Sequence, residues 1–386
     1  MTYIPSWPVL APRSLLGHVP ARSLPFPLSA PRRHSFYVAR GGIYHLVRAL
    51  GCADGGTVLM PDYNSGAEVW AVRAAGATVR CYHVGRDMQV DLDELKALCD
   101  LRPRALYLIH YLGWPQPVNE VKILCRERGI PLIEDCALSL LSEVEGRPLG
   151  TFGDFAVFCL YKSLPVPNGG LLVQNTDGPS ALNGLELRPC SRVSVVARSS
   201  ELLLMWLRAR SDPLGAALLR GKRAAGWTLD RLGVARHPIG DISPEFSTAG
   251  YDISKLDTAM SPWCAGLLDR LDYQAIVRLR RENFLRLAGR LKGRVALARR
   301  DLPEGVCPLF LPILVPDKAA ASRALREHGI EAVEFWNYGH PDADGQAGPD
   351  AAFLRRHLLE LPIHQDVTTA QIDFMAERVL RLDPCA

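Results

Sequence analysis

Two charged residues at the ends of predicted buried strands carry the clearest chemical signal in this sequence. Asp135 ends the apolar segment LIED (132–135), and Lys162 follows the apolar segment FAVFCLY (155–161). A carboxylate at the end of a buried strand carries a desolvation cost, so it needs a cationic or hydrogen-bonding partner. Partial burial and nearby cations lower the pKa of a lysine at such a position, which suits an amine that forms a Schiff base.

A protonated pyridine nitrogen is a suitable partner for Asp135, because a carboxylate beside it keeps a pyridoxal phosphate ring acting as an electron sink. We therefore predict pyridoxal 5'-phosphate as the cofactor, held by Lys162 and tuned by Asp135. The alternatives are an Asp135 that caps the following turn and a Lys162 that is solvated. The order and spacing of the two residues favour the cofactor. Asn168-Gly169-Gly170 predicts the turn that returns the chain to the sheet.

The elements that position these residues alternate between strand and helix. Apolar, β-rich runs predict strands at 57–63, 78–84, 104–112, 130–136, 155–161 and 169–175. Helical spacing lies between them at 65–76, 91–101 and 117–129. Two of these helices end at Gly76 and Gly129, as helix C-caps often do. Such alternation predicts a mostly parallel sheet with helices on both faces, which binds ligands at the carboxyl ends of its strands.

The rest of the chain has a different composition. Residues 1–35 contain seven prolines, which predicts an extended arm without helix. Residues 177–247 are Arg-rich and predict a helical insertion with a leucine cluster at 201–207. One long helix is predicted from Ser254 to Leu291. A strand at 309–315, a helix at 318–329 and a closing helix from Thr369 complete the pattern.

We therefore expect three parts: an N-terminal arm (1–35), a large cofactor-binding domain (36–250) and a linking helix with a small α+β domain (251–386). A chain of 386 residues is long for one hydrophobic core. The content of 48% hydrophobic and 22% charged residues is ordinary for a globular protein.

Charge and cysteine usage restrict the partners and the compartment. The formal net charge of +4 is too small to indicate a nucleic-acid partner. Ten scattered cysteines without a CxxC pair predict apolar core residues in a reducing compartment, and no metal site is predicted. The sequence shows no secretory signal and no apolar run of about 18 residues. We therefore expect a cytoplasmic protein.

Several segments in order resemble the DegT–StrS group of sugar aminotransferases. These are ARGGIYHLVRALG (39–51), VLMPDYNSGAEVWAVRAAGATV (58–79), LIHYLGWP (108–115), LIEDCALS (132–139), RPLGTFGDFAVF (147–158), Lys162 before its GG turn, and LELPIHQDVT (359–368). Each motif alone is loose, whereas their order and distances are specific. The resemblance covers about 36–176 and 250–380.

The resemblance implies an α/β protein of the pyridoxal-phosphate-dependent transferase fold type I. That fold has a mostly parallel seven-stranded sheet flanked by helices and a smaller C-terminal α+β domain. The implied reaction moves an amino group from an amino acid such as glutamate to a keto acceptor such as a nucleotide-linked keto sugar. A homodimer is implied because the family builds its site at a subunit interface.

Five residues are candidates for further cofactor contacts. Gly41, Gly42 and Ile43 open a predicted helix whose free N–H groups suit a phosphate, although a plain glycine-containing helix start is the alternative. Tyr63 lies near the position where the family packs a residue on the cofactor ring, or it is a core tyrosine. Cys159 is the nearest equivalent of the phosphate-binding serine that precedes the family's lysine.

Three further residues are candidates for substrate contacts. His110 ends a strand near the predicted site, and a satisfied core histidine is the alternative. Trp336 and His364 lie in the small domain, which in this fold faces the cofactor, so they would hold a sugar or pack a loop.

Besides Cys159, the sequence departs from the family at two places. Leu138 stands where the family usually has a glutamine beside the phenolic oxygen of the cofactor. Asp252-Ile253-Ser254 replaces the Asn-x-Arg that usually enters the neighbouring subunit's site. These changes keep two alternatives open: another pyridoxal phosphate reaction, such as dehydration or condensation, and a non-catalytic relative used for binding.

The segment 188–236 has ten basic and three acidic residues, and it contains Trp206. A solvated face of an ordinary insertion is one interpretation. The other is peripheral contact with an anionic membrane or an acidic carrier protein.

Overall fold

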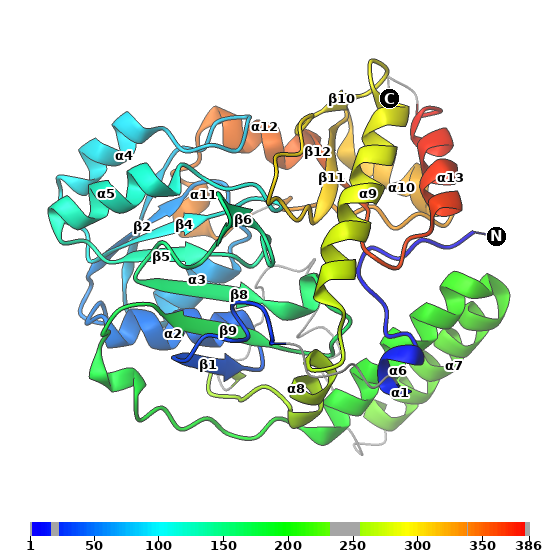
Figure 1. Ribbon diagram of the computed structural model, residues 1–386, viewed down its shortest axis with the longest axis horizontal. Coiled ribbons are helices and arrows are strands. Elements are labelled where there is room, and N and C mark those ends of the chain that lie inside the picture. The colour runs from blue at the N-terminus through cyan, green and yellow to red at the C-terminus, as the bar shows by residue number, and fades with distance from the viewer. Residues whose placement is uncertain (1, 17–22, 232–254, 338, 383–386) are drawn as a thin grey trace.

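The computed structural model describes residues 2–16, 23–231, 255–337 and 339–382 (Figure 1). Its main element is a seven-stranded sheet with the order β1-β9-β8-β5-β4-β2-β3. The strands in that order are β1 (Arg33–Phe36), β9 (Gly170–Gln174), β8 (Phe155–Cys159), β5 (Leu132–Asp135), β4 (Ala105–Ile109), β2 (Thr57–Pro61) and β3 (Thr78–Tyr82). The predicted mostly parallel sheet is confirmed. The pairs from β8 to β3 are parallel, whereas β9 runs antiparallel to both β8 and β1.

Four helices between these strands flank the sheet (Figure 1). They are α2 (Ala39–Ala49), α3 (Ala67–Ala74), α4 (Leu92–Cys99) and α5 (Val118–Arg128). Helix α2 contacts α3, and α4 contacts α5. Asp91 begins α4 by accepting the N–H groups of Asp93 and Glu94, and Gly129 ends α5 in the left-handed conformation.

The C-terminal part of the chain forms a three-stranded antiparallel sheet, β10 (Ala296–Leu297), β11 (Phe310–Leu314) and β12 (Leu358–Pro362). Its helices are α10 (Lys318–Glu327), α11 (Pro341–Asp344), α12 (Pro349–His357) and α13 (Thr369–Val379). The predicted strand at 309–315 and the helices at 318–329 and from Thr369 are therefore present. Thr368 and Gln371 form a capping box that begins α13.

The prediction of one long helix from 254 to 291 is wrong. The chain instead forms α8 (Pro262–Leu268) and then α9 (Tyr273–Leu291). The side chain of Ser261 accepts the N–H of Cys264 and that of Asp272 accepts the N–H of Ala275, so each helix has its own N-cap. The apolar spacing continues across the break, which is why it suggested a single helix.

The N-terminal arm is extended, but it is not free of helix. Helix α1 (Arg13–Leu16) follows Pro12. Most of residues 3–11 are buried. Ile4 pairs with Ile330, and the Trp7 ring lies 5.0 Å from the Phe310 ring. Proline prevents long helices but permits this packed, extended course.

The Arg-rich segment forms two antiparallel helices, α6 (Arg192–Arg210) and α7 (Asp212–Arg231), which lie side by side away from the main sheet (Figure 1). Residues 232–247 of the predicted insertion, and Asp252 to Ser254, lie outside the described residues. Within the part of the chain that the structure describes, no helix has both the length and the apolar character needed to cross a membrane.

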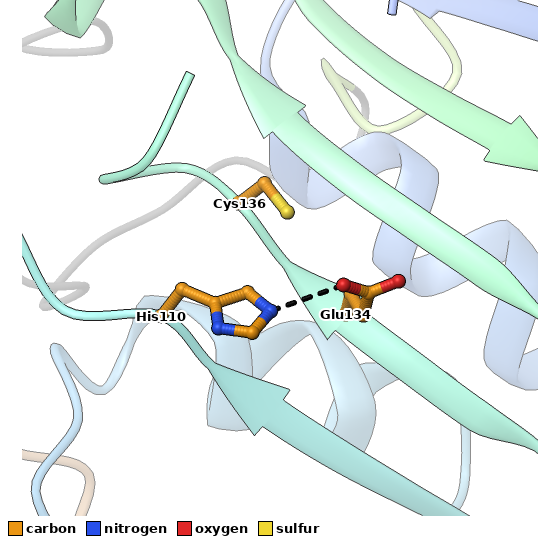
Figure 2. A group of neighbouring side chains, drawn as sticks. All are labelled: His110, Glu134 and Cys136. Carbon is orange, nitrogen blue, oxygen red and sulfur yellow. Dashed lines mark hydrogen bonds and ion pairs between the residues drawn. The ribbon is translucent and has the colours of Figure 1, made fainter. Parts of the chain in front are cut away.

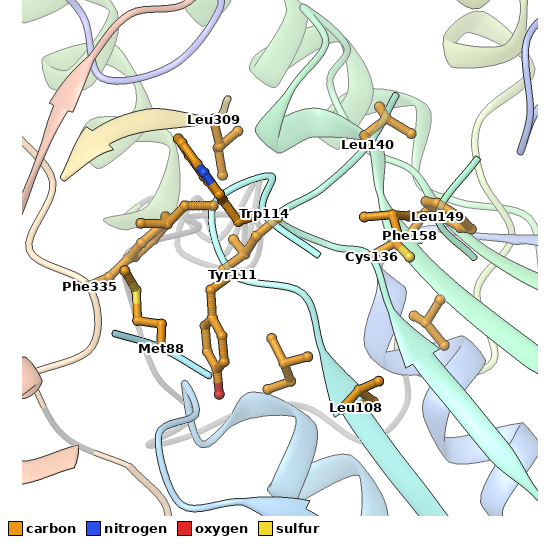
Figure 3. Close-up of a cluster of buried hydrophobic side chains, with 14 of the residues drawn as sticks. Met88, Leu108, Tyr111, Trp114, Cys136, Leu140, Leu149, Phe158, Leu309 and Phe335 are labelled. Atoms are coloured by element: carbon orange, nitrogen blue, oxygen red, sulfur yellow. The ribbon is translucent and has the colours of Figure 1, made fainter. Parts of the chain in front are cut away.

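The hydrophobic core is continuous from the main sheet to the C-terminal part. Figure 3 shows a section of it, in which Leu108 of β4 and Phe158 of β8 lie in one cluster with Leu309 and Phe335 from the C-terminal part. Lys162, just after the carboxyl end of β8, has its Nζ 5.8 Å from the centre of the Phe335 ring.

Candidate active site

The carboxylate of Glu134 in β5 is fully buried and accepts four hydrogen bonds. Its Oε1 accepts the N–H groups of Phe152 at 2.7 Å and Gly153 at 2.6 Å. Its Oε2 accepts the N–H of Gly150 at 2.9 Å and Nε2–H of His110 at 3.1 Å (Figure 2). These four donors fill the acceptor sites of a carboxylate. The glycine-rich loop 150–154, which leads into β8, is therefore hydrogen-bonded to the neighbouring strand β5.

Further hydrogen bonds to Leu132 and Asn175 also hold the same loop. Asp154 accepts the N–H of Leu132 at 2.9 Å, at the start of β5. The side-chain amide of Asn175 donates to the carbonyl groups of Gly150 and Gly153 at 2.7 and 2.9 Å. Both ends of the four-residue strand β5 are thus held by residues 150–154, which fixes where Asp135 lies.

His110 is buried, and both of its ring nitrogens have partners inside the protein. The N–H of Gln116 donates to Nδ1 at 3.0 Å, so the hydrogen on the ring is on Nε2, which donates to Glu134. This arrangement favours the satisfied core histidine over the substrate contact that was the other expectation.

His110, Glu134 and Cys136 have potential metal-ligand atoms within 4.8 Å of one another (Figure 2). A metal would need a lone pair on Nε2, but that nitrogen carries the hydrogen that Glu134 accepts. The lone pairs of Glu134 are taken by backbone N–H groups. Hydrogen bonds within the protein therefore account for this cluster.

Asp135 points away from Glu134, because successive strand residues alternate between the two faces. It is 6% exposed and accepts the hydroxyl of Tyr107 at 2.7 Å and the N–H of Ala137 at 2.8 Å. Burial raises the pKa of Asp135 to about 6, and the charge of Glu68 acts in the same direction. The two hydrogen bonds and the charge of Lys162 lower it. Among the described residues Asp135 forms no ion pair, so the buried carboxylate is without a cation in direct contact.

Lys162 lies beside Asp135 because β5 and β8 are adjacent and parallel. Strand β8 ends at Cys159, and the 3-10 turn η1 (Leu160–Lys162) follows it directly. The Lys162 charge lowers the pKa of both Asp135 and Cys159, although burial dominates and raises both. The Lys162 Nζ atom lies 5.8 Å from the centre of the Phe335 ring. The structure therefore brings together the two residues that the sequence singled out.

The Gly169-Gly170 turn joins the lysine segment to the start of α2. The carbonyl of Gly169 accepts the N–H of Leu160 at 2.9 Å. A Cβ atom on Gly170 would lie 2.3 Å from the backbone nitrogen of Ala39, so only glycine permits this approach. The first turn of α2 is thereby placed next to the end of β8.

Gly41, Gly42 and Ile43 are buried in the first turn of α2. A Cβ atom on Gly41 would lie 2.7 Å from the carbonyl oxygen of Leu256 and 2.8 Å from the Phe36 ring. The glycines are therefore required by packing, whatever else they do. The side chain of Ile43 lies in the core, so only its backbone faces a ligand.

Two cations lie at this helix start. Burial and the positive charge of Arg40 lower the pKa of Lys255, which places the two side chains within electrostatic reach of each other. The N-cap residue Val38 has no side chain that accepts the first N–H groups of α2. The positive end of the helix dipole and two positive charges together suit a phosphate group.

Tyr63 and Trp336 belong to one buried aromatic cluster. The Tyr63 ring lies 5.0 Å from the ring of Trp336 and 5.6 Å from that of Tyr111. The Trp336 ring in turn lies 5.6 Å from the ring of Phe335, whose centre is 5.8 Å from Lys162 Nζ. Trp336 is therefore near the predicted site, whereas Tyr63 packs as a core tyrosine and its ring contacts other aromatic side chains.

His364 lies away from these residues and holds the N-terminal arm. It is 1% exposed, and its Nε2 donates to the carbonyl of Pro5 at 2.9 Å. Its Nδ1 accepts the N–H of Asp366 at 3.3 Å. Both nitrogens are used within the protein, which favours loop packing over the substrate contact expected from the family's Leu-Pro-x-His segment.

Glu68 is a buried carboxylate near the site, and it was not among the residues predicted from the sequence. Its two oxygens accept the N–H and the hydroxyl of Ser65 at the start of α3. It raises the pKa values of Asp135 and Tyr107. The Ser65-x-x-Glu68 spacing is that of a capping box and was the available signal.

These residues fit pyridoxal phosphate. The buried Asp135 without a contacting cation suits a pyridinium N–H, Lys162 supplies an amine next to it, and the start of α2 suits the phosphate. Leu138 and Cys159 are buried side chains that add no strong hydrogen-bonding group. The fit therefore depends mainly on charged groups: Asp135 for the ring nitrogen, and Arg40 and Lys255 for the phosphate.

The hydrogen bonds of Glu134 lead to a prediction. Glu134→Gln places an amide NH2 among N–H donors, so at least one buried donor loses its acceptor. We expect the free energy of unfolding to fall by about 3 kcal/mol, measured by urea denaturation. Glu143→Gln, at an exposed carboxylate in β6 (Glu143–Val144), is the control and should be nearly neutral. A loss no larger than that of the control would contradict the prediction.

Comparison with known proteins agrees with this geometry. Residues 39–188 match the DegT/DnrJ/EryC1/StrS aminotransferase family. Over 150 residues the chain is 31% identical to a GDP-perosamine synthase of Vibrio cholerae, which covers 38% of this chain and 41% of that protein. Over 132 residues it is 33% identical to a dTDP-4-dehydro-2,3,6-trideoxy-D-glucose 4-aminotransferase of Saccharopolyspora spinosa, covering 33% and 34%. These alignments span well under half of either relative.

Solved structures extend the likeness of fold to nearly the whole chain. PseC of Helicobacter pylori, an aminotransferase of pseudoaminic acid biosynthesis, has a TM-score of 0.66 with 16% identity and 99% of both chains covered. The GDP-4-keto-6-deoxy-D-mannose-3-dehydratase of E. coli has a TM-score of 0.64 with 15% identity, covering 91% of this chain and 88% of that one. The resemblance expected from the motifs is therefore confirmed: residues 39–188 match the DegT/DnrJ/EryC1/StrS aminotransferase family, and the chain has the fold of pyridoxal-phosphate-dependent sugar aminotransferases.

Proposed function

We propose that this protein is a pyridoxal-phosphate-dependent aminotransferase that moves an amino group from an amino acid such as glutamate to a nucleotide-linked keto sugar. The observation that carries the proposal is the pairing of Asp135 and Lys162 at the ends of adjacent parallel strands. Asp135 is buried, has a pKa raised to about 6 by burial and contacts no described cation. Such a carboxylate is costly to keep unless a cationic ligand completes it.

Each residue has a stated task in the proposed mechanism. When bound, pyridoxal phosphate supplies an electron sink for a carbanion. Lys162 would hold it through Nζ, and the same Nζ would hold and release a proton as general base and acid. An Oδ atom of Asp135 would accept a hydrogen bond from the protonated ring nitrogen and so favour its charge. The start of α2, with Arg40 and Lys255, would hold the phosphate.

The proposal extends to substrate contacts, assembly and compartment. Trp336 is the remaining substrate-contact candidate from the C-terminal part, because it adjoins Phe335. A homodimer follows from the family's site at a subunit interface. A cytoplasmic location follows from the nine described cysteines, all free thiols and eight of them buried.

Two other functions are outcomes of the same experiments. Leu138 stands where the family usually has a glutamine, and this change keeps a different pyridoxal phosphate reaction, such as dehydration, as an alternative. A non-catalytic relative would not explain why Asp135 and Lys162 are both present and adjacent. Absorbance of the bound cofactor separates the binding protein from the enzymes, and its loss on adding glutamate separates transamination from the other reactions.

Lys162→Ala tests the covalent attachment. The purified wild-type protein should retain cofactor that borohydride fixes to the chain, and the variant should retain none, because it lacks the amine that forms the bond. Mass spectrometry of the reduced peptide measures this directly. Lys96→Ala, at an exposed lysine in α4, is the control and should behave like the wild type. A reducible adduct in Lys162→Ala would refute the assignment.

Asp135→Asn tests the partner of the ring nitrogen. Turnover should fall by about 100-fold or more, since removing one preorganised electrostatic contact costs about that much. Cofactor affinity of the wild type should weaken as pH falls through about 6, because Asp135 has its pKa raised to about 6 and loses its charge below it. Fluorescence titration with the cofactor between pH 5 and 8 measures this affinity, and the change should be centred near the pKa of Asp135. Unchanged turnover in the variant would reduce Asp135 to a turn cap.

We also propose that α6 and α7 make peripheral contact with an anionic membrane. The leucine cluster at 201–207 is buried or half-buried, so it does not provide the contact surface. The exposed apolar residues of the pair are instead Val193, Val196, Leu214 and Leu218. Arg192, Arg210, Arg220 and Arg223 are exposed on the same two helices. Apolar and basic groups on one element suit an anionic bilayer, to which each basic residue adds about 1 kcal/mol.

Co-sedimentation with vesicles tests this contact. The protein should pellet with anionic vesicles at low salt, but neither at high salt nor with neutral vesicles, because salt screens charges beyond about 10 Å at 0.1 M. Arg220→Glu/Arg223→Glu should abolish pelleting. Arg126→Glu/Arg323→Glu, an equal change at exposed arginines elsewhere, should not. No pelleting of the wild type at low salt would eliminate the membrane and leave a carrier protein or a plain insertion.

A further inference from the structure

Arg280 of α9 is a charged side chain that lies almost wholly inside the protein, at 1% exposure. Its guanidinium donates to four oxygens: to Oε1 of Gln365 at 2.9 Å and to the carbonyl groups of Pro308, Leu309 and Ser163 at 3.3, 3.1 and 3.0 Å. These acceptors belong to three segments far apart in sequence. Two of the segments flank strands of the C-terminal sheet, and the third is the turn that carries Lys162.

The acceptor of most interest is the Ser163 carbonyl. Ser163 is the residue after Lys162 and is itself buried. Its carbonyl oxygen accepts from Arg280 Nη2 at 3.0 Å and also from Gln365 Nε2 at 3.2 Å. The backbone on the C-terminal side of Lys162 is thus held by two side chains, one of them charged, and a charged donor makes a stronger hydrogen bond.

Burying Arg280 in this way is costly. Burial lowers its pKa, and among the described residues no carboxylate lies within ion-pair distance of it. A leucine or methionine of similar volume would fill the site without that desolvation cost. Stability therefore does not explain why an arginine is buried here with only neutral oxygens as acceptors. Its planar guanidinium does, because it holds several oxygens in fixed positions relative to one another.

We propose that Arg280, together with Gln365, is a positioning residue for Lys162. It fixes the peptide after the lysine relative to residues 308–309 and 365, and so keeps Nζ directed between Asp135 and Phe335. The inference rests on the proposed function, because it assigns a task to the lysine. It adds that the lysine's orientation is set from the C-terminal part of the chain.

The neighbouring Arg281 provides a matched control. It is on the same helix and also donates to backbone carbonyl groups, those of Pro303 and Val306 at 2.8 and 2.6 Å. It bonds the same loop that Arg280 bonds, but it has no hydrogen bond to Ser163. Arg281→Lys therefore removes comparable loop contacts and leaves the lysine turn untouched.

The experiment uses the full chain with pyridoxal phosphate added to protein from which it was removed. Four variants are compared with the wild type: Arg280→Lys, Gln365→Met, the double variant that combines these two changes, and Arg281→Lys. The measurements are the rate at which the borohydride-reducible adduct forms at Lys162, kcat and KM for the amino donor, and the unfolding midpoint. All rates are taken well below the lowest midpoint.

We expect Arg280→Lys to slow adduct formation and kcat by about 100-fold, the loss that a small misplacement of a reacting group produces. KM for the donor should stay near the wild-type value, because Arg280 touches no proposed substrate contact. Gln365→Met should give a smaller loss of the same kind. The double variant should lose less than the product of the two single losses, because both act on one carbonyl. Arg281→Lys should lower only the unfolding midpoint.

The outcomes are distinguishable. Absence of any adduct in the wild type would refute the proposed function and this inference with it. A wild-type adduct that forms equally fast in Arg280→Lys, or slows equally in Arg281→Lys, would refute the inference alone. If Arg280→Lys does not fold, Gln365→Met decides, because a normal adduct rate in that variant would show that the Ser163 carbonyl does not orient the lysine.

Discussion

The carboxylate of Glu134 is the interaction on which the geometry of this site depends. It is buried without a cation and is satisfied by three backbone N–H groups and one imidazole. Removing any of these donors would leave a buried charged oxygen without one of its hydrogen bonds. Such a change strongly lowers the free energy of unfolding. The loop from 150 to 154, which leads directly into β8, is therefore held against β5 in one conformation, and β8 begins from a fixed point. Because β8 starts from a fixed point, the turn at its end, which carries Lys162, is also fixed in position.

Glu134 and Asp135 are adjacent carboxylates with opposite situations. Strand alternation directs Glu134 into the loop that satisfies it and Asp135 to the other face, where two hydrogen bonds leave its pKa raised to about 6 by burial. A cation in contact would reverse that shift, and the nearby Lys162 does so only in part. The folded chain thus carries one carboxylate that completes the fold and one that a ligand completes. This division explains why a two-residue acidic motif at a strand end serves both stability and binding.

The parts that were predictable from sequence are those set by local patterns. Period-two apolar runs and helical spacing locate the strands and helices of the main sheet, and the parallel order then places Asp135 and Lys162 at neighbouring ends. The break between α8 and α9 was missed because apolar spacing continues through it, and only the caps at Ser261 and Asp272 mark it. The hydrogen-bond partners of His364 and Arg280 lie 359 and up to 117 residues away in sequence, so no local pattern indicates them. Long-range hydrogen bonds decide whether such side chains face a ligand or the core.

The departures from the family change what holds the cofactor. Leu138 and Cys159 are buried and provide no strong hydrogen-bonding group, so under the proposed function this chain would give the middle of the cofactor few polar contacts. The two ends retain charge, with Asp135 at one and Arg40 and Lys255 near the start of α2 at the other. Electrostatic contacts of this kind are strong in a buried site but tolerate small shifts of position, unlike a set of short hydrogen bonds. Under the proposed function, the orientation of the reacting lysine would then come from elsewhere, and the hydrogen bonds that Arg280 and Gln365 make to the Ser163 carbonyl are our proposed source of it.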